Sequence, residues 1–212
     1  MRKYLVIGNP IEHSLSPELH NYWIKNNNIN ANYEKKKLDE KELKNVILEV
    51  KRKNIHGVNV TVPFKNVIIS YLDQLSPEAE KTQSVNTIYL SGEKVIGHNT
   101  DVNGFKLGIE NTKFNTIGKR ILILGAGGVV PSIIYALKEM MVSKITISNR
   151  TRIKAEKLRK LFKDIEVLDW GDLDNFDMII NATSVGIKKQ DKINIDFSKV
   201  LKNKFFYDLI YN

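Results

Sequence analysis

Two ionisable side chains, Lys65 and Asp101, lie among polar residues where strands are expected to end and helices to begin. Lys65 closes the segment N-V-T-V-P-F-K, residues 59–65, and Asp101 closes the segment N-T-D, residues 99–101. An ammonium group stays charged beside a carboxylate, so such a pair can donate a proton to a carbonyl group that is being reduced. The alternatives are a surface lysine and a carboxylate that only caps the next helix. We predict a proton-handling pair that faces a cleft between two domains.

Other polar side chains occur at the same kind of position. The segment G-N-P-I-E-H-S-L-S-P, residues 8–17, brings Ser14 and Ser16 to a helix start, where Ser16 followed by proline fits an N-cap with proline at N1. A cap alone does not need two serines, although Ser14 could simply shape the loop. Spare hydroxyls at a helix N-terminus suit a carboxylate ligand. In residues 59–62, Asn59 and Thr61 alternate with two valines and so share one face of a strand.

A glycine-rich turn predicts a dinucleotide site. The apolar run 121–124 leads into G-A-G-G, residues 125–128, and then into a helical stretch at about 129–141 with Pro131 in its first turn. A second apolar strand follows at 144–148. Strand, turn, helix and strand form one βαβ unit whose helix N-terminus suits a pyrophosphate. Val130 departs from the G-x-G-x-x-G pattern, because it stands where the third glycine would fall.

The end of the second strand indicates which dinucleotide is bound. An NAD site usually has Asp or Glu there, about 20 residues after the glycines, to hold the ribose 2′-hydroxyl. This chain has Asn149 and Arg150, with Lys154 one helical turn later. A guanidinium group pairs with a 2′-phosphate, which a carboxylate would repel. The pattern predicts NADP.

Strands and helices that alternate along the chain would position these residues. Alternation of this kind is typical of an α/β protein with mainly parallel sheets. We predict a mainly parallel α/β substrate domain at residues 1–100 and a Rossmann dinucleotide-binding domain at residues 101–212. The expected strands are 3–8, 32–37, 56–62, 85–90, 95–96, 121–124, 144–148, 165–168, 177–181 and 205–209, and the expected helices are 16–27, 39–53, 64–72, 101–111, 129–141 and 152–163.

Composition narrows the possible partners. The 212 residues are 42% hydrophobic and 27% charged, as in ordinary globular proteins, and no apolar run approaches the length of a membrane span. The net charge of +9 comes mainly from scattered lysines without interleaved aromatic residues, which argues against nucleic-acid binding. There is no cysteine, and the four histidines lack metal-ligand spacing. We expect a cytoplasmic protein without metal, nucleic-acid or membrane partners, as a monomer or homodimer.

Seven motifs in order resemble the shikimate dehydrogenase family: G-x-P-x-x-H-S-x-S-P, N-V-T-V-P-F-K, V-N-T, N-T-D, G-A-G-G, N-R-T and N-A-T-S-V-G. The likeness runs from Tyr4 to Tyr211. It implies NADPH-dependent reduction of 3-dehydroshikimate to shikimate in aromatic amino-acid biosynthesis. Members of the family continue through further helices that return to the substrate domain, and nothing here matches that segment. We therefore expect an incomplete copy with an exposed apolar face and weak activity.

The resemblance also implies roles for individual residues. Lys65 and Asp101 would be the acid–base pair. The substrate would contact Ser14, Ser16, Asn59, Thr61, Lys65, Asn86, Asp101 and Tyr211. The cofactor would contact Gly125, Ala126, Gly127, Gly128, Val129, Asn149, Arg150, Thr151, Lys154, Ala182, Thr183, Ser184 and Leu209. Two alternatives stay open: a quinate/shikimate dehydrogenase that uses NAD, and a catalytically silent ligand-binding relative.

Overall fold

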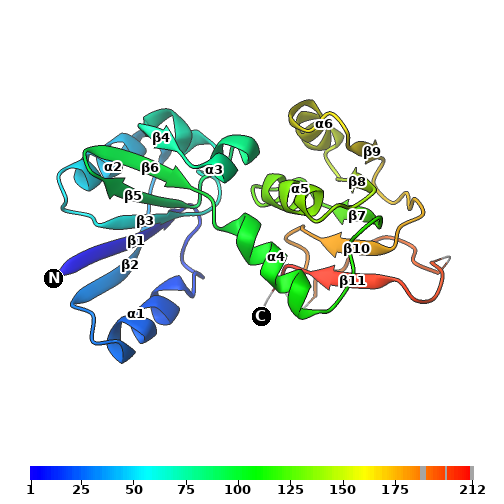
Figure 1. The fold of residues 1–212 in the computed structure, drawn as a ribbon, viewed down its shortest axis with the longest axis horizontal. Helices are drawn as coiled ribbons and strands as arrows, with labels where there is room; N and C mark the ends of the chain where they lie inside the picture. The colour runs from blue at the N-terminus through cyan, green and yellow to red at the C-terminus, as the bar shows by residue number, and fades with distance from the viewer. Residues whose placement is uncertain (187–189, 199, 211–212) are drawn as a thin grey trace. The chain divides into compact units, whose positions relative to one another are not determined.

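The computed structural model describes residues 1–186, 190–198 and 200–210 of the chain. It divides into two compact units, Met1–Asp101 and Val102–Asn212, each with its own sheet. Figure 1 shows the elements of both units in chain order from blue to red.

The first unit is a six-stranded mixed sheet with the strand order β2-β1-β3-β5-β6-β4. Parallel pairing joins β2, β1 and β3, and also joins β4 to β6, whereas β5 runs antiparallel to both of its neighbours. The strands are β1 (Arg2–Gly8), β2 (Ala31–Lys37), β3 (Gly57–Val60), β4 (Gln74–Leu75), β5 (Thr87–Ser91) and β6 (Lys94–His98), and the helices are α1 (Ser16–Asn26), α2 (Leu43–Lys51), α3 (Pro77–Thr82) and the 3-10 helices η1 (Glu40–Glu42) and η2 (Val67–Tyr71).

The two faces of this sheet have different cores. In β1, Leu5 and Ile7 point to the face where the main cluster includes the buried residues of α2, because successive side chains on a strand alternate between faces. Val6 points to the opposite face and packs with Ile11 and Tyr33 in a smaller cluster. Asn59 pairs in register with Val6, so the polar position of β3 belongs to this second face.

The region after β3 differs from the predicted helix 64–72. Residues 62–66 form turns, and only Val67–Tyr71 is helical, as a 3-10 helix. Proline at position 63 cannot donate a backbone hydrogen bond, and the run V-I-I at residues 67–69 is β-branched, which disfavours an α-helix. The strand β4 and the helix α3 that follow were not predicted. Elsewhere the expected elements are present, with ends shifted by a few residues.

The second unit is a parallel five-stranded sheet with the order β11-β10-β7-β8-β9. The strand order reverses beside β7, which is the topological switch point at which doubly wound sheets bind their ligands. This unit confirms the predicted Rossmann fold and, with the first unit, the predicted α/β fold class. Its strands are β7 (Arg120–Leu124), β8 (Lys144–Ser148), β9 (Glu166–Leu168), β10 (Met178–Asn181) and β11 (Phe205–Asp208), and its helices are α4 (Asp101–Asn111), α5 (Val130–Glu139) and α6 (Arg152–Leu161).

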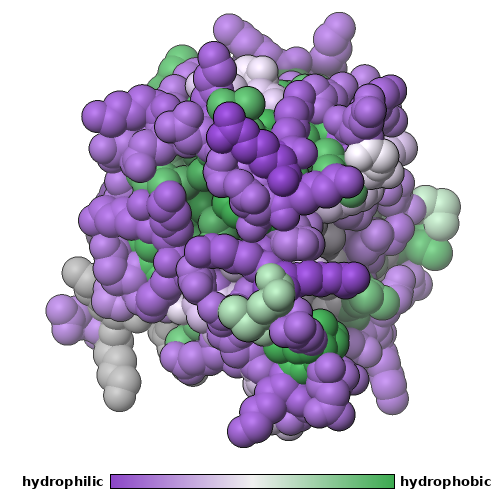
Figure 2. All heavy atoms as spheres, turned by 90° about the vertical axis from the view of Figure 1, so that its left-hand side faces the viewer, coloured by the Kyte–Doolittle hydropathy of each residue, from purple (hydrophilic) through white to green (hydrophobic). Residues whose placement is uncertain are grey.

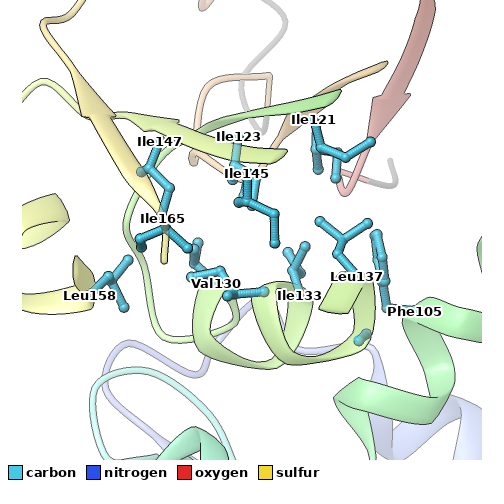
Figure 3. Close-up of a cluster of buried hydrophobic side chains, with 14 of the residues drawn as sticks. Phe105, Ile121, Ile123, Val130, Ile133, Leu137, Ile145, Ile147, Leu158 and Ile165 are labelled. Atoms are coloured by element: carbon cyan, nitrogen blue, oxygen red, sulfur yellow. The ribbon is translucent and has the colours of Figure 1, made fainter. Parts of the chain in front are cut away.

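The helix α5 is held against this sheet by one apolar stripe. Val130, Ile133 and Leu137 lie at helical spacing and point toward the isoleucines of β7 and β8 (Figure 3). Val130, the residue that replaces the third glycine, is fully buried among them. The packing brings the N-terminus of α5 to the carboxyl end of β7, where a pyrophosphate would bind.

The surface is mostly hydrophilic on the side shown in Figure 2, where hydrophobic side chains form several separate areas. The helix α1 has no buried residue. One face of this helix carries four exposed hydrophobic side chains, Leu15, Leu19, Tyr22 and Trp23.

None of the helices in the described residues has the length and apolar character needed to cross a membrane.

Candidate active site

Four polar segments of the first unit, residues 8–17, 59–65, 85–87 and 99–101, meet at one edge of its sheet. Strands β1 and β3 are parallel, so the loops that follow Gly8 and Val60 leave from the same edge. Because β5 is antiparallel to β3 and β6 is antiparallel to β5, the start of β5 and the end of β6 lie at that edge too. Topology therefore brings together segments that are up to about ninety residues apart in the sequence.

Lys65 and Asp101 form an ion pair at this edge. The Lys65 Nζ atom donates to Asp101 Oδ2 at 2.6 Å, and the two side chains are only 15% and 22% exposed. Lys65 lies in the turn before η2 and not at the start of a helix as predicted, because the helix begins later. Its carbonyl oxygen accepts the amide of Val85 at 2.8 Å, which ties the turn to the segment before β5. Asp101 is the first residue of α4.

Asn86 holds the other oxygen of the Asp101 carboxylate. Its Nδ2 donates to Asp101 Oδ1 and to Thr100 Oγ1, both at 2.9 Å, while its Oδ1 accepts the backbone amide of Thr100 at 3.0 Å. A backbone N–H can only donate, so this contact fixes which end of the Asn86 amide faces Asp101. The carboxylate is therefore held by a cation on one oxygen and by an amide donor on the other.

Asn59 on β3 is bonded to the segment that carries Asn86. Its Nδ2 donates to the backbone oxygen of Asn86 at 3.2 Å and to Thr87 Oγ1 at 3.1 Å, and its Oδ1 accepts the Tyr33 hydroxyl at 2.7 Å. Thr61 follows β3 and is half-buried, with its amide bonded to the oxygen of Ile7 at 2.9 Å. The structure thus brings Asn59, Asn86 and Asp101 into one hydrogen-bonded group, with Thr61 beside them on the chain.

The two serines of the first loop are arranged differently from the prediction. Leu15 is the N-cap of α1, and Ser16 is the first helical residue instead of the cap. The Ser14 hydroxyl accepts the amide of Ser16 at 3.3 Å, so Ser14 satisfies one of the free N–H groups at the helix start. Both serines are half-buried in the loop that leaves the edge described above.

The glycine turn of the second unit depends on Gly125. Its φ is +110°, and a Cβ atom at this position would lie 2.7 Å from the backbone oxygen of Ala182. Only glycine can adopt this conformation so close to another backbone. At Gly127 the same oxygen would be 3.9 Å from a Cβ atom. Val129 is the N-cap of α5, and the amides of Val130 and Ser132 in the first turn bond to the backbone oxygens of Gly127 and Val129 at 3.1 and 3.0 Å. The glycine turn lies directly before this helix start, where the helix dipole favours an anion.

Basic side chains follow β8. Arg150 and Lys154 are exposed, and no carboxylate of the described residues forms an ion pair with either one. Arg152, by contrast, is paired with Asp169 and Glu156. Asn149 donates through Nδ2 to the oxygen of Thr151 at 2.8 Å, which shapes the turn that carries Arg150. The two unpaired cations leave this end of the strand ready for an anionic group.

The loop after β10 is folded around Asn181. Its Oδ1 accepts the amide and the hydroxyl of Thr183 at 3.1 and 2.7 Å, and its Nδ2 donates to Asp208 Oδ1 at 3.0 Å. Leu209 follows Asp208, and its amide bonds to the oxygen of Asn181 at 3.1 Å. The predicted cofactor residues Ala182, Thr183, Ser184 and Leu209 therefore lie around one polar side chain. Tyr211, predicted to contact the substrate, lies outside the described residues.

Four side chains that hold the polar groups of the two units, three in the first and one in the second, were not predicted from the sequence. Thr87 and Thr100 lie inside recognised motifs, and Asn181 begins another, so their motif positions were a usable signal. Tyr33 gave no signal, because nothing in an edge-strand sequence shows that its hydroxyl reaches Asn59. Among the described residues, no group of three or more His, Cys, Asp or Glu side chains could hold a metal ion.

A Rossmann unit with unpaired cations after its second strand, together with a Lys–Asp pair in a second α/β unit, defines the class of dinucleotide-dependent oxidoreductases. Residues 6–88 match the shikimate dehydrogenase substrate binding domain, and residues 109–209 match the shikimate/quinate 5-dehydrogenase family. The chain belongs to the shikimate dehydrogenase family.

Individual relatives are similar over the whole of this chain. A shikimate dehydrogenase (NADP(+)) from Pelagibacter ubique (strain HTCC1062) is 58% identical over 211 residues, which cover 100% of this chain and 80% of that protein. The crystal structure of the Aquifex aeolicus shikimate dehydrogenase superposes with a TM-score of 0.91 at 36% identity, over 100% of this chain and 80% of that one. The Thermus thermophilus enzyme in complex with NADP(H) and shikimate gives 0.87 at 28% identity, over 100% and 79%.

Proposed function

We propose that this protein interconverts 3-dehydroshikimate and shikimate with NADPH and NADP. The observation that carries the proposal is the Lys65–Asp101 pair, at 2.6 Å, inside a polar group that the topology assembles at one sheet edge. A relative with 58% identity over the whole chain is a shikimate dehydrogenase (NADP(+)), which supports the same reaction here. Both family matches lie in the same order along the chain as the two units of the structure.

The Lys65 ammonium is the proposed proton donor in the reductive direction. NADPH, when bound, supplies the hydride that goes to the carbonyl carbon. Lys65 transfers one proton to the carbonyl oxygen as the negative charge develops there, and in the oxidative direction neutral Lys65 takes the proton back. Asp101 lies against the ammonium and holds it in place before transfer. Among the described residues, one of the three N–H donors of Lys65 is used, on Asp101, and two are left for the substrate.

The remaining substrate contacts are proposed from their place at the sheet edge. Residues 1–100 would form the substrate domain. Ser14 and Ser16, in the loop at the start of α1, would bind the carboxylate of shikimate. Asn59, Thr61, Asn86 and Asp101 would bind ring hydroxyls, and Tyr211 would complete the set.

The cofactor contacts are proposed in residues 101–212. Gly125, Ala126, Gly127, Gly128 and Val129 would contact the pyrophosphate at the start of α5, where the turn has no bulky side chain to keep the phosphates away. Asn149, Arg150, Thr151 and Lys154 would surround the 2′-phosphate, for which the unpaired guanidinium of Arg150 supplies a two-pronged contact. Ala182, Thr183, Ser184 and Leu209 would line the nicotinamide, in the loop that Asn181 organises.

The test is an assay of the purified protein with four substrate and cofactor pairs. Shikimate and quinate are each offered with NADP and with NAD, and the appearance of reduced cofactor is followed by absorbance. We expect the highest kcat/KM with shikimate and NADP. Faster turnover of quinate with NAD would favour a quinate/shikimate dehydrogenase, and tight shikimate binding without turnover would favour a silent relative.

A further inference from the structure

A tyrosine outside every recognised motif lies against the polar group of the first unit. Tyr33 belongs to the edge strand β2, and its ring is buried with Val6 and Ile11 on the face of the sheet that carries Asn59. The strand β1 separates Tyr33 from Asn59 in the sheet, so the ring spans β1 to reach the asparagine. Its hydroxyl ends 2.7 Å from Asn59 Oδ1.

The direction of this hydrogen bond is set by the other contacts of Asn59. The Asn59 amide group approaches the backbone oxygen of Asn86, which can only accept, so the Nδ2 end must face Asn86. The Oδ1 end then faces Tyr33, and the tyrosine hydroxyl is the donor. Burial raises the pKa of the Tyr33 hydroxyl, so it keeps its proton throughout the neutral range.

A row of hydrogen bonds, in which each residue donates to the next, leads from Tyr33 to the ion pair. Tyr33 donates to Asn59, Asn59 donates to Thr87 Oγ1 at 3.1 Å, and Thr87 donates to Asn86 Oδ1 at 3.0 Å. Asn86 donates in turn to Asp101 Oδ1 at 2.9 Å. Each member of such a row polarises the next, so the row strengthens toward the carboxylate.

Two neighbouring residues of α1 fix Tyr33 itself. The side-chain amide of Asn21 accepts the Tyr33 N–H at 3.0 Å and donates to its carbonyl oxygen at 2.8 Å, as a paired strand would. The ring of His20 stacks on the tyrosine ring at 4.2 Å with an interplanar angle of 3°. Burial lowers the pKa of His20, which favours a neutral stacking partner. Tyr33 is thus held by its backbone, its ring and its hydroxyl.

We propose that Tyr33 is a positioning residue for substrate binding, which fixes the amide of Asn59 so that Asn59 offers the substrate an acceptor and not a donor. Both N–H groups of Asn59 are already used, on Asn86 and Thr87, while Oδ1 has a second lone pair beside the tyrosine contact. A ring hydroxyl of the substrate would donate to that lone pair. This inference rests on the proposed function, because it takes shikimate as the ligand.

The variant that tests the inference is Tyr33→Phe, which removes the hydroxyl and keeps the ring. The loss of one neutral hydrogen bond should raise the KM for shikimate roughly two- to ten-fold and change kcat less, because the proposed contact of Asn59 is with a ring hydroxyl and not with the carbonyl that is reduced. The matched control is Tyr4→Phe. Tyr4 is the register partner of Tyr33 on β1, and among the described residues its hydroxyl has no hydrogen-bond partner, so KM should not change.

A double-mutant cycle separates positioning from simple packing. If Tyr33 acts through Asn59, Tyr33→Phe should have no further effect on KM in an Asn59→Ala background. Equal effects in both backgrounds would overturn the proposal, as would an unchanged KM in the single variant. Where turnover of Asn59→Ala is too slow to measure, the dissociation constant of shikimate from calorimetry completes the same cycle.

A readout without substrate keeps this inference distinct from the proposed function. The side-chain amide protons of Asn59, followed by 1H–15N NMR, should exchange faster with water in Tyr33→Phe than in the unsubstituted protein or in Tyr4→Phe. If the unsubstituted protein did not oxidise shikimate, the proposed function would fail while this measurement still tested the link between Tyr33 and Asn59. Identical exchange in all three proteins would show that Tyr33 does not hold the amide.

Discussion

Replacing Lys65 by methionine tests the chemistry most directly. Methionine keeps an unbranched apolar chain and removes the ammonium group, which lies 2.6 Å from Asp101. A general acid contributes about 10²- to 10⁴-fold to the rate, so kcat should fall by that factor, equivalent to about 3–5 kcal/mol in the activation barrier. The KM for shikimate should change much less, because a proton donor acts mainly in the transition state.

The stability of the variant should fall only moderately. Lys65→Met leaves Asp101 without its cation, but that carboxylate is 22% exposed and keeps the Asn86 amide at 2.9 Å. Water can therefore replace part of the lost contact, and the cost in unfolding free energy should be about 1–3 kcal/mol. Thermal unfolding followed by circular dichroism checks this, so that a loss of rate is not confused with a loss of fold.

Two further variants decide what Lys65 does. Lys65→Arg keeps the positive charge but holds its proton too tightly to donate it at neutral pH, so it should be nearly as slow as Lys65→Met. Lys81→Met removes an exposed lysine of α3 in the same unit and should keep normal kcat. Steady-state rates in both directions are the measurement. Near-normal kcat in Lys65→Met, or full rescue by arginine, would refute the assignment of Lys65 as the proton donor.

Three other substitutions test the second unit. Arg150→Ala should weaken the binding of NADP by roughly ten- to a hundred-fold and the binding of NAD hardly at all, since a charge-assisted contact contributes about 1.5–3 kcal/mol. Equal losses of affinity in titrations with the two cofactors would contradict the contact with the 2′-phosphate. Gly125→Ala should destabilise the protein by about 1–3 kcal/mol more than Gly171→Ala in urea unfolding, because both have φ near +100° but only Gly125 would place a Cβ atom 2.7 Å from a backbone oxygen. Hydrogen bonds from Arg120 lower the pKa of Asp177 to about 2, so the stabilising effect of this carboxylate should be complete above about pH 4 and fade toward pH 2. Asp177→Asn should therefore lower the melting temperature at pH 7, and the melting temperatures of the variant and the parent protein should converge in acid. A constant difference between them down to pH 2 would contradict this.

The Rossmann unit was predictable because its strands are buried on both faces. The segments 121–124 and 144–148 are apolar runs bounded by turn residues, which is how a covered parallel strand looks in a sequence. The basic residue at the end of the second run could likewise be located by counting from the glycines. The full burial of Val130 shows that the third glycine position tolerates a larger residue, because the side chain fills the space between helix and sheet.

The first unit was harder to predict at its turns. The difference between a serine N-cap and a serine at the first helical position is one residue, and sequence patterns do not resolve helix ends that finely. The predicted helix that would have begun at Phe64 failed for a different reason. Its apolar spacing resembled a helix, but the turn after Pro63 and the β-branched residues that follow leave only a short 3-10 segment.

The polar contacts show where sequence patterns stop being informative. Polar residues at strand ends predicted a shared site, since parallel strands end at one edge of a sheet. The contact between Tyr33 and Asn59 depends on strand order and register, with β1 placed between the two residues. Neither property follows from local sequence, because a shift of one residue in register would turn the tyrosine to the other face.

The pattern of used and unused hydrogen-bonding groups makes the site selective. A buried polar group is costly unless its partners are satisfied, and among the described residues no buried side-chain nitrogen or oxygen lacks a partner. The side-chain amide of Asn86 already donates to Thr100 and Asp101, and both N–H groups of Asn59 are taken. Within the described part of the chain, Asn59 keeps one acceptor position and Lys65 keeps two donors for the substrate. A ligand must then supply a hydroxyl to the first and an oxygen to the second, and one that lacks either would leave a group unpaired, which costs more than a missing apolar contact.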